Sequence, residues 1–313
     1  MDYKDIVRVN KNVKEKLITK KDDLLVCARN GSARLIGKNA ILHEADANQT
    51  FGAFMMVFRS DKNHFVHQLL NTKRYSSQVS ENLGARINQI TSSDLSSFEF
   101  FFPTENSEMN KIAALLDLID ERIATQNKII NKLQSLIKGI AQKIVRSNKP
   151  NVRLFECVEC SSSILQESEV CEQGTYPVYG ANGIVGYLDN YNTEGEAVYI
   201  IKDGSGVGTV SYVTGKCSAT GTLNTLQAKN GYSLQYLYYL LKVFNFEPYK
   251  TGMAIPHIYF KDYGKAKFFC PSYTEQLQYA QSLSAIDSKL LVEKNILTNL
   301  TLQKQYLLRQ MFI

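Results

Sequence analysis

Cationic and amide side chains gather around two glycine turns in the first third of the chain. Arginine carries a fork of donors that fits guanine O6 and N7, asparagine pairs in the same way with adenine, and lysine and serine suit phosphate oxygens. The residues of these types are Arg29, Asn30, Ser32, Arg34 and Lys38 around Gly31, with Arg86 and Asn88 beside Gly84. This pattern predicts a surface that contacts duplex DNA. Solvated loop charges without a ligand are the alternative for any one of these residues.

The second half of the chain offers a different set of contact residues. Fourteen of the 18 tyrosines lie between residues 176 and 273, and Arg153 is the one arginine of residues 151–272. Most of these tyrosines are expected in the core, but those in glycine-rich loops are harder to explain by packing. The predicted contact residues are Tyr176, Tyr179, Asn182, Lys202, Asp203, Ser205, Lys250, Thr251, Met253 and His257. Two surfaces that read different DNA sequences would differ in this way.

No catalytic signature accompanies these residues. The chain has no Pro-Pro-aromatic motif of an amino-methyltransferase, no glycine–lysine pair followed by serine or threonine, and no Glu-x-Lys of a common nuclease site. The glycine-rich run at residues 204–208 lacks the spacing of a dinucleotide-binding turn. We therefore expect no catalytic residue and no cofactor bound by this chain.

A zinc site is an alternative raised by three cysteines. Cys157 and Cys160 have the spacing of a zinc ligand pair, and Cys171 follows. No second pair of this spacing occurs, and the nearest downstream histidine is His257. Packing cysteines are therefore the favoured interpretation, and no bound metal is expected.

An internal repeat organises the chain. Residues 84–103 align without a gap on residues 252–271, with seven identities that include both glycines, both aspartates and both prolines. The tripeptide at 30–32 has a looser counterpart at 203–205. The chain therefore contains two similar globular repeats. The Gly84 and Gly252 turns are expected to face DNA in equivalent ways.

A long helical pattern follows each repeat. Apolar residues recur at steps of three and four from Ile112 to Ile144 and again from Tyr279 to Met311. Both series have a polar residue at the same level, Gln126 and Glu293, and the second series also contains Lys304. We expect the two helices to pair as an antiparallel coiled coil through Ile119, Ile123, Ile130, Leu133, Ile286, Leu290, Leu297 and Leu300. The alternative is that each helix packs onto its own globular repeat.

The two repeats are predicted to be mixed α/β (α+β) domains. Strands are expected at residues 22–28, 35–42, 53–58, 197–202 and 209–214, and buried helices at 65–71 and 235–244. The predicted domains are residues 1–104 and 151–272, and the long helices that follow them are predicted in residues 105–150 and 273–313. The first domain is about 20 to 25 residues shorter at its amino end than the second.

Composition agrees with a globular protein that has a mild excess of positive charge. Hydrophobic residues make up 44%, charged residues 21%, and the net charge is +6. This excess favours an acidic partner such as nucleic acid. A charged amino end without a signal peptide, the absence of a long apolar run, and six scattered cysteines predict a cytoplasmic protein with reduced thiols and no membrane contact.

The residues also carry a resemblance to a known family. The runs TYPVYGANGIVGYLDNY (175–191) and GEAVYIIKDGSGVGTVSYV (195–213) resemble a target-recognition domain of type I restriction–modification specificity subunits. Both long helical segments are similar to the spacer helices of that family. The order recognition domain, helix, recognition domain, helix covers nearly the whole chain, and the short amino end departs from the family's pattern.

The resemblance implies a sequence-specific DNA-recognition subunit without catalytic activity. It implies that the chain reads a bipartite site in double-stranded DNA and that the paired helices set the gap between the half-sites. It also implies that methyltransferase subunits, two in number, and restriction/translocase subunits bind to the chain. S-adenosylmethionine, ATP and Mg²⁺ are then expected on those partner subunits, in a complex that methylates adenine and restricts DNA.

Two interpretations from other classes remain open. One is a coiled-coil scaffold that joins two partners without binding DNA, which a gel-shift experiment would distinguish. The other is a stand-alone methyltransferase, which a cofactor-binding measurement would distinguish. The basic glycine turns disfavour the first, and the missing motifs disfavour the second.

Overall fold

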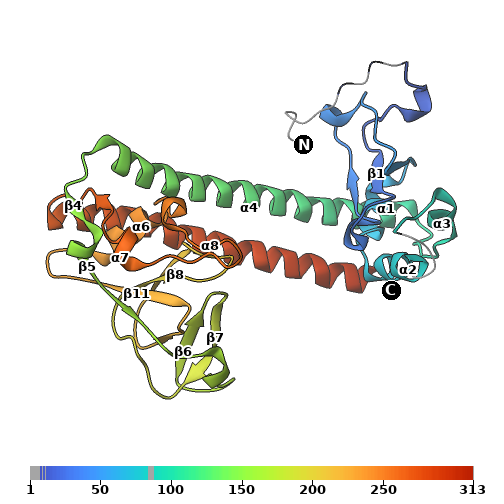
Figure 1. Cartoon of the computed structure of the whole chain (residues 1–313). Helices are drawn as coiled ribbons and strands as arrows, with labels where there is room; N and C mark the ends of the chain where they lie inside the picture. Colours follow the sequence, from blue (N-terminus) through green and yellow to red (C-terminus); the bar gives the residue numbers. More distant parts are fainter. Residues whose placement is uncertain (1–7, 9, 11, 84–87, 313) are drawn as a thin grey trace. The chain divides into compact units, whose positions relative to one another are not determined.

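A computed structural model describes residues 8, 10, 12–83 and 88–312 of the chain (Figure 1). The chain forms two compact units, of which unit 1 comprises Met1–Asn127 and Asn295–Ile313 and unit 2 comprises Lys128–Lys294. The mixed α/β fold predicted from the sequence is confirmed. The predicted domain limits stay a prediction, because the compact units divide each of the two long helices between them.

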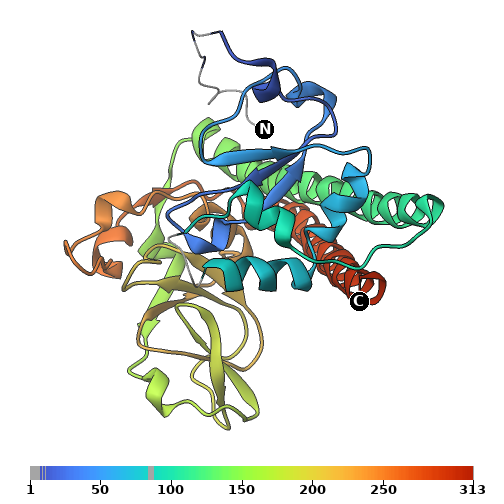
Figure 2. The ribbon, with the colours of Figure 1, turned by 90° about the vertical axis from the view of Figure 1, so that its right-hand side faces the viewer.

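Unit 1 is built on a three-stranded antiparallel sheet with strand order β2-β1-β3. Leu24 and Val26 of the central strand are fully buried, and Tyr75 and Val79 of a neighbouring helix pack in the same core. In Figure 2 the blue strands face the viewer and this helix, α2, lies along one side of them. The elements are β1 (Leu24–Cys27), β2 (Asn39–Ile41), β3 (Met55–Phe58), α1 (Asn63–Leu69), α2 (Lys73–Leu83) and α3 (Ser92–Ser97).

One predicted strand of unit 1 is shorter than the sequence indicates. Residues 35–42 were expected to be extended throughout, but only Asn39–Ile41 form β2, and a 3₁₀ turn occupies Ala33–Leu35. Gly37 lies between the two with a φ of +78°, a left-handed conformation that interrupts a strand. The apolar residues of this segment alternate as they do in a strand, but the left-handed backbone at Gly37 interrupts the extended conformation.

Among the described residues, unit 2 contains more strands than unit 1. Its four-stranded antiparallel sheet has the order β5-β11-β8-β9, and a second sheet has the order β10-β6-β7. All residues of β8 are buried, as the continuous apolar run at this position predicts. Its helices and strands are β4 (Val152–Arg153), α5 (Leu154–Cys157), β5 (Val158–Ser162), β6 (Tyr176–Gly180), β7 (Gly183–Leu188), β8 (Ala197–Ile201), β9 (Val210–Val213), β10 (Ser218–Ala219), β11 (Leu223–Ala228), α6 (Leu234–Leu241), α7 (Phe260–Tyr263) and β12 (Lys267–Phe268).

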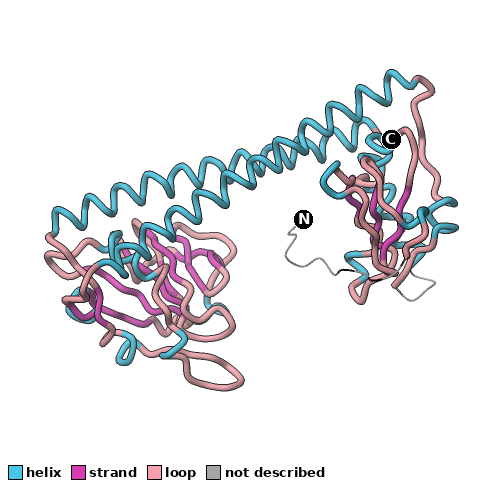
Figure 3. The backbone as a smooth tube through the Cα atoms, turned by 90° about the horizontal axis from the view of Figure 1, so that it is seen from above, coloured by secondary structure: helices cyan, strands magenta, loops and turns pink. Residues whose placement is uncertain are grey.

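Two long helices, α4 (Asn106–Ser147) and α8 (Tyr273–Met311), run through both units. In unit 1 the start of α4 packs against the end of α8, where Leu116 clusters with Leu308 and Asp120 forms an ion pair with Lys304 at 2.6 Å. Residue numbers rise along one helix as they fall along the other, so the helices are antiparallel here. Figure 3 shows the two cyan helices side by side.

In unit 2 the end of α4 lies beside the start of α8. The side chain of Asn151 donates to the Cys270 carbonyl at 2.7 Å and accepts from the Cys270 N–H at 2.8 Å. This exchange holds the residues that follow α4 next to those that precede α8. The helices are therefore antiparallel in unit 2 as well.

The residues expected in the seam between the helices differ in their burial. Ile119, Ile130 and Leu290 are buried, and the other five, Ile123, Leu133, Ile286, Leu297 and Leu300, are partly buried. Tyr279, which the heptad pattern also places in the seam, is exposed, whereas Ala280 is buried. The first turns of α8 face α6 instead, because Gln276 accepts a hydrogen bond from the Ser233 N–H at 2.9 Å.

Candidate nucleic-acid interface

Two loop segments of unit 1 lie side by side at the end of β1. The Ile90 N–H donates to the Ala28 carbonyl at 2.9 Å, and Arg29 forms an isolated antiparallel bridge with Gln89. The Asn88 side chain donates to the Gly31 carbonyl at 3.3 Å. Residues 28–32 and 88–90 therefore form one surface, which we call loop pair 1.

Loop pair 1 brings together several residues predicted from the sequence. Arg29 is exposed, and Asn30 and Ser32 are partly buried because the Asn30 side chain accepts from the Ser32 N–H at 2.9 Å. Asn88 belongs to the same surface. Gly84 and Arg86, which were predicted to contribute to it, lie outside the described residues.

Unit 2 repeats this arrangement at the end of β8. The Ile258 N–H donates to the Lys202 carbonyl at 2.9 Å, and Asp203 forms an isolated antiparallel bridge with His257. The Gly204 N–H donates to the Pro256 carbonyl at 2.9 Å. Residues 202–206 and 256–258 form loop pair 2, which contains the predicted residues Lys202, Asp203, Ser205 and His257.

The backbone bonds of the two loop pairs define how the repeats correspond. Ile90 and Ile258 are 2% and 1% exposed, and each anchors its loop pair in the core of its unit. Their bonds align Ala28 with Lys202, one position away from the tripeptide alignment of residues 30–32 with 203–205. Arg29 therefore corresponds to Asp203. The same backbone arrangement therefore presents the positive side chain of Arg29 in unit 1 and the negative side chain of Asp203 in unit 2.

The other predicted residues of unit 2 fall into two places. Thr251 exchanges backbone hydrogen bonds with His257, at 2.9 and 2.8 Å, and so adjoins loop pair 2. Lys250 is ion-paired with Glu247 at 2.6 Å. Met253, which lies between Thr251 and His257 in the chain, is fully exposed.

Tyr176, Tyr179 and Asn182 lie on the β6–β7 hairpin, in a different sheet from loop pair 2. The Tyr179 ring packs at 5.6 Å from the buried Tyr199 ring, and burial raises the pKa of Tyr179 above its usual value. Tyr176 packs against Tyr191 at 5.2 Å. Packing therefore accounts for both tyrosines, and Asn182 is the exposed residue of the three.

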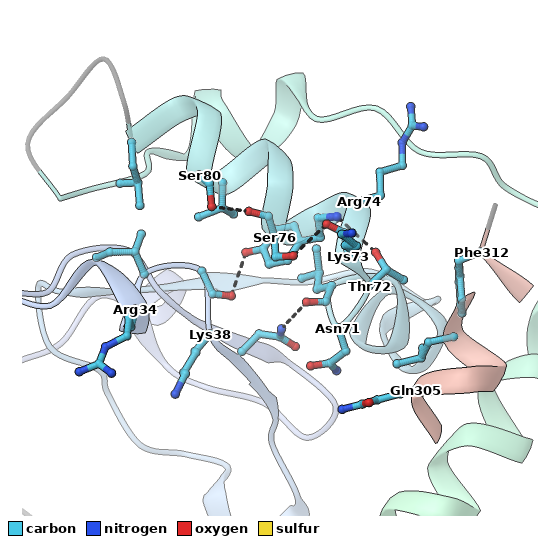
Figure 4. A pocket seen from close by; sticks show the side chains of 18 of the residues that line it. Arg34, Lys38, Asn71, Thr72, Lys73, Arg74, Ser76, Ser80, Gln305 and Phe312 are labelled. Carbon is cyan, nitrogen blue, oxygen red and sulfur yellow. Dashed lines mark hydrogen bonds between the residues drawn. The ribbon is translucent and has the colours of Figure 1, made fainter. Parts of the chain in front are cut away.

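A groove of about 850 Å³ in unit 1 gathers further cations (Figure 4). Arg34 and Lys38, both predicted from the sequence, line it and extend on the same side in Figure 4. Lys73, Arg74 and Arg309 also line it, from α2 and the end of α8. Within the described ranges, none of these five cations forms an ion pair with a carboxylate.

Sequence reasoning missed the three helical cations of this groove. Arg74 points away from Arg34 and Lys38 in Figure 4, and its guanidinium lies 4.8 Å from the Phe101 ring centroid. Arg309 lies far from the others in the sequence. The adjacent Lys73 and Arg74 at the start of α2 were the available signal, but helix surfaces carry such charges without a ligand.

Of the cysteines raised as zinc ligands, Cys157 is buried, Cys160 is partly buried and Cys171 is exposed. Cys157 Sγ lies 4.0 Å from Cys270 Sγ, and both side chains are buried. Burial raises the pKa of Cys160 to about 11, which disfavours the thiolate that zinc requires. Within the described ranges, no group of three or more His, Cys, Asp and Glu side chains is placed to hold a metal ion.

A helix that spans a membrane needs about 20 consecutive, predominantly apolar residues. Across the part of the chain that the structure describes, no helix is long and apolar enough to cross a membrane.

The sequence matches the model of a known protein family. The family model described as the type I restriction modification DNA specificity domain matches residues 2–135 and 152–302. The chain belongs to this family. The two matched regions each contain one of the loop pairs. The resemblance to type I specificity subunits found in the sequence is thereby confirmed.

Two curated relatives in this family match shorter stretches. The type I restriction enzyme EcoprrI specificity subunit of Escherichia coli is 27% identical over 126 residues, which cover 40% of this chain and 31% of that protein. A putative type I specificity subunit of Haemophilus influenzae, S.HindORF215P, is 33% identical over 89 residues, or 28% of this chain and 23% of that protein. The matches thus span less than a third of each relative's length.

Two solved structures share the fold of this chain. The S subunit of a type I restriction–modification system from M. genitalium superposes with a TM-score of 0.69 at 21% identity, over 96% of this chain and 85% of that chain. A chain from a structural study of the assembly and conformational transition of a type I system gives a TM-score of 0.52 at 14% identity, over 94% and 82%. At these identities the similarity concerns the fold.

Proposed function

We propose that this chain is the DNA-recognition subunit of a type I restriction–modification complex and that it reads a bipartite site, one half-site with each loop pair. The observation that carries the proposal is the repeated frame of loop pairs 1 and 2, which presents different side chains from the same backbone arrangement. A shared frame with different exposed groups is the expected design for two half-sites of different sequence.

The chemistry of the two loop pairs supports base recognition. Loop pair 1 offers Arg29 and Asn88, whose donors suit guanine and adenine in the major groove. Loop pair 2 offers Asp203, which accepts from cytosine N4, together with Lys202 and His257. The cations that line the groove of unit 1 suit the phosphates beside a half-site, where they would release counterions.

An exposed apolar stripe on α4 supports the docking of partner subunits. In unit 1 its residues are Leu115 and Leu118, which lie outside the buried seam and are each more than a third exposed. In unit 1 a groove of about 400 Å³ adjoins this stripe and is also lined by Ile296 and Leu300 of α8. A helix of a partner would bury its apolar face there.

The proposed complex assigns the chemistry to other subunits. We propose that two methyltransferase subunits bind along α4 and α8, that restriction/translocase subunits join them, and that these partners bind S-adenosylmethionine, ATP and Mg²⁺. The two long helices would set the unread gap between the half-sites. The chain itself would act in the cytoplasm without catalysing a reaction.

Methylome sequencing tests this function directly. Cells that carry the gene with its neighbouring methyltransferase and restriction genes should show adenine methylation at one bipartite motif, and deletion of this gene alone should abolish it. A methylated motif that survives the deletion would contradict the proposal. Methyl transfer by the purified chain alone would show that it is an enzyme and would contradict its role as a non-catalytic subunit.

A further inference from the structure

A short hairpin beside loop pair 2 holds two apolar side chains in solvent. Residues 251–257 form this hairpin, in which Met253 is 106% exposed and Ile255 is 67% exposed. Large apolar residues at a loop tip contribute nothing to the core, and such an exposed pair marks a contact surface. We call Met253 and Ile255 the apolar tip.

The hairpin is held firmly on both sides. Thr251 and His257 exchange two backbone hydrogen bonds at 2.9 and 2.8 Å, and the Gly204 N–H donates to the Pro256 carbonyl at 2.9 Å. Gly252 has a φ of +86°, and a Cβ atom there would clash with the Ile255 carbonyl oxygen. The backbone therefore fixes the apolar tip before any ligand arrives, which lowers the entropic cost of binding.

The surroundings of the apolar tip indicate the kind of ligand. Lys202, Asp203 and Ser205 of loop pair 2 adjoin the hairpin, and the His257 ring stacks edge-on against Tyr259 at 5.1 Å. An apolar point surrounded by donors and acceptors matches the major groove of DNA. There the thymine 5-methyl is the one apolar group on the base edges.

We propose that Met253 and Ile255 contact thymine 5-methyl groups in the half-site read by unit 2. This inference rests on the proposed function and adds a specificity contact to it. The apolar tip thus selects thymine at one or two positions, while the polar residues of loop pair 2 read the neighbouring bases.

The test removes the methyl group from the DNA and leaves every base-edge hydrogen bond in place. The full chain is purified in complex with its methyltransferase subunits, and the methylome identifies the half-sites. Duplexes are then made in which deoxyuridine replaces thymidine, one position at a time, in each half-site. The wild-type complex should bind about fourfold more weakly for each contacted methyl group lost, and only in one half-site.

Substitutions in the apolar tip test whether Met253 and Ile255 cause the weaker binding of the deoxyuridine duplexes. Met253→Gln combined with Ile255→Ala should bind the thymidine and deoxyuridine duplexes equally, because the apolar contact is gone from the protein side. Met253→Leu should keep the discrimination. Ile164→Ala, a matched control that truncates an apolar side chain 94% exposed in the loop after β5, should also keep it.

The outcomes separate this inference from the proposed function. If the wild-type complex binds its motif but does not distinguish thymidine from deoxyuridine at any position, the apolar tip does not read methyl groups and the proposed function stands. Discrimination that persists in the Met253→Gln, Ile255→Ala variant assigns the contact to other residues and overturns the inference. Failure to find any methylated motif overturns both.

Discussion

Units 1 and 2 attach equivalent short helices to equivalent positions of the long helices, with different chemistry. In unit 1, Gln68 of α1 donates to Asp117 at 2.8 Å and to Asp120 at 2.9 Å, and Lys304 pairs with Asp120. In unit 2, Tyr239 of α6 donates to Asp287 at 3.4 Å. Asp120 and Asp287 occupy the same level of the helical repeat, but within the described residues only Asp120 forms an ion pair with a cation.

The same contrast recurs at Asp23, which directly precedes β1, and at the aligned residue of unit 2. Asp23, 1% exposed, accepts from Arg59 Nε and Nη2 at 2.6 Å each. The alignment of the loop pairs places Ala197, fully buried, at this position in unit 2. Unit 1 is therefore held by ionic bonds where unit 2 is held by apolar packing, so acid and loss of a charge should act mainly on unit 1.

The largest expected effect comes from removing the partner of Asp23. Burial alone would raise the pKa of Asp23, but hydrogen bonds from Arg59 and the Lys20 N–H hold that pKa below its usual value. Arg59→Met leaves a buried carboxylate without its cation and should lower the free energy of unfolding of unit 1 by about 3 kcal/mol. Hydrogen exchange of β1 compared with β8 would measure the loss in each unit, and equal losses would contradict the contrast.

The ion pair of Asp23 with Arg59 predicts which unit loses stability first as the pH falls. Because the folded pKa of Asp23 is lowered, its contribution to stability is present above the unfolded value of about 3.9 and is lost as pH falls through the folded value. Below about pH 4, exchange in β1 should accelerate more than in β8. Asp23→Asn should remove this difference, at the expense of stability at neutral pH.

A smaller difference is expected where the short helices meet the long ones. Asp120→Ala removes a carboxylate that accepts from Lys304 and Gln68. The Lys304 side chain is 15% exposed and Gln68 is fully buried, so neither donor can be fully hydrated after the substitution. The change should lower the free energy of unfolding of unit 1 by about 2 kcal/mol. Asp287→Ala is the matched variant in unit 2. It loses one hydrogen bond from Tyr239 and should cost less than about 1 kcal/mol. Urea unfolding of both variants would sharpen the comparison, and a larger loss for Asp287→Ala would reverse it.

The smallest effect concerns DNA and compares the two exposed charges of the loop pairs. Arg29→Ala should weaken binding by about 1 kcal/mol and relax specificity at one position of one half-site. Asp203→Ala should relax the other half-site. Binding to duplexes with single base-pair changes would measure both, and a loss that is uniform across all sequences would make Arg29 a phosphate contact.

Local patterns were sufficient to predict the repeats, the fold class and the helices. The heptad spacing of Leu116, Ile119 and Ile130 depends on neighbouring residues only, so it was visible without the structure. The bridge between Arg29 and Gln89 and the ion pair of Asp120 with Lys304 join residues far apart in the sequence, and no local signal announces such pairs. The candidate site was therefore predicted as residue types near glycine turns, without the pairing that unites them.

The reciprocal hydrogen bonds of Asn151 and Cys270 bear on how such a protein can change. The chain enters and leaves the globular part of unit 2 at neighbouring points, and one amide side chain joins them. A genetic exchange that replaced residues 152–269 would need to preserve two adjacent junctions and would leave both long helices intact. The domain is thus connected to the rest of the protein in the manner of an exchangeable cassette, and under the proposed function one recombination event would replace one half-site.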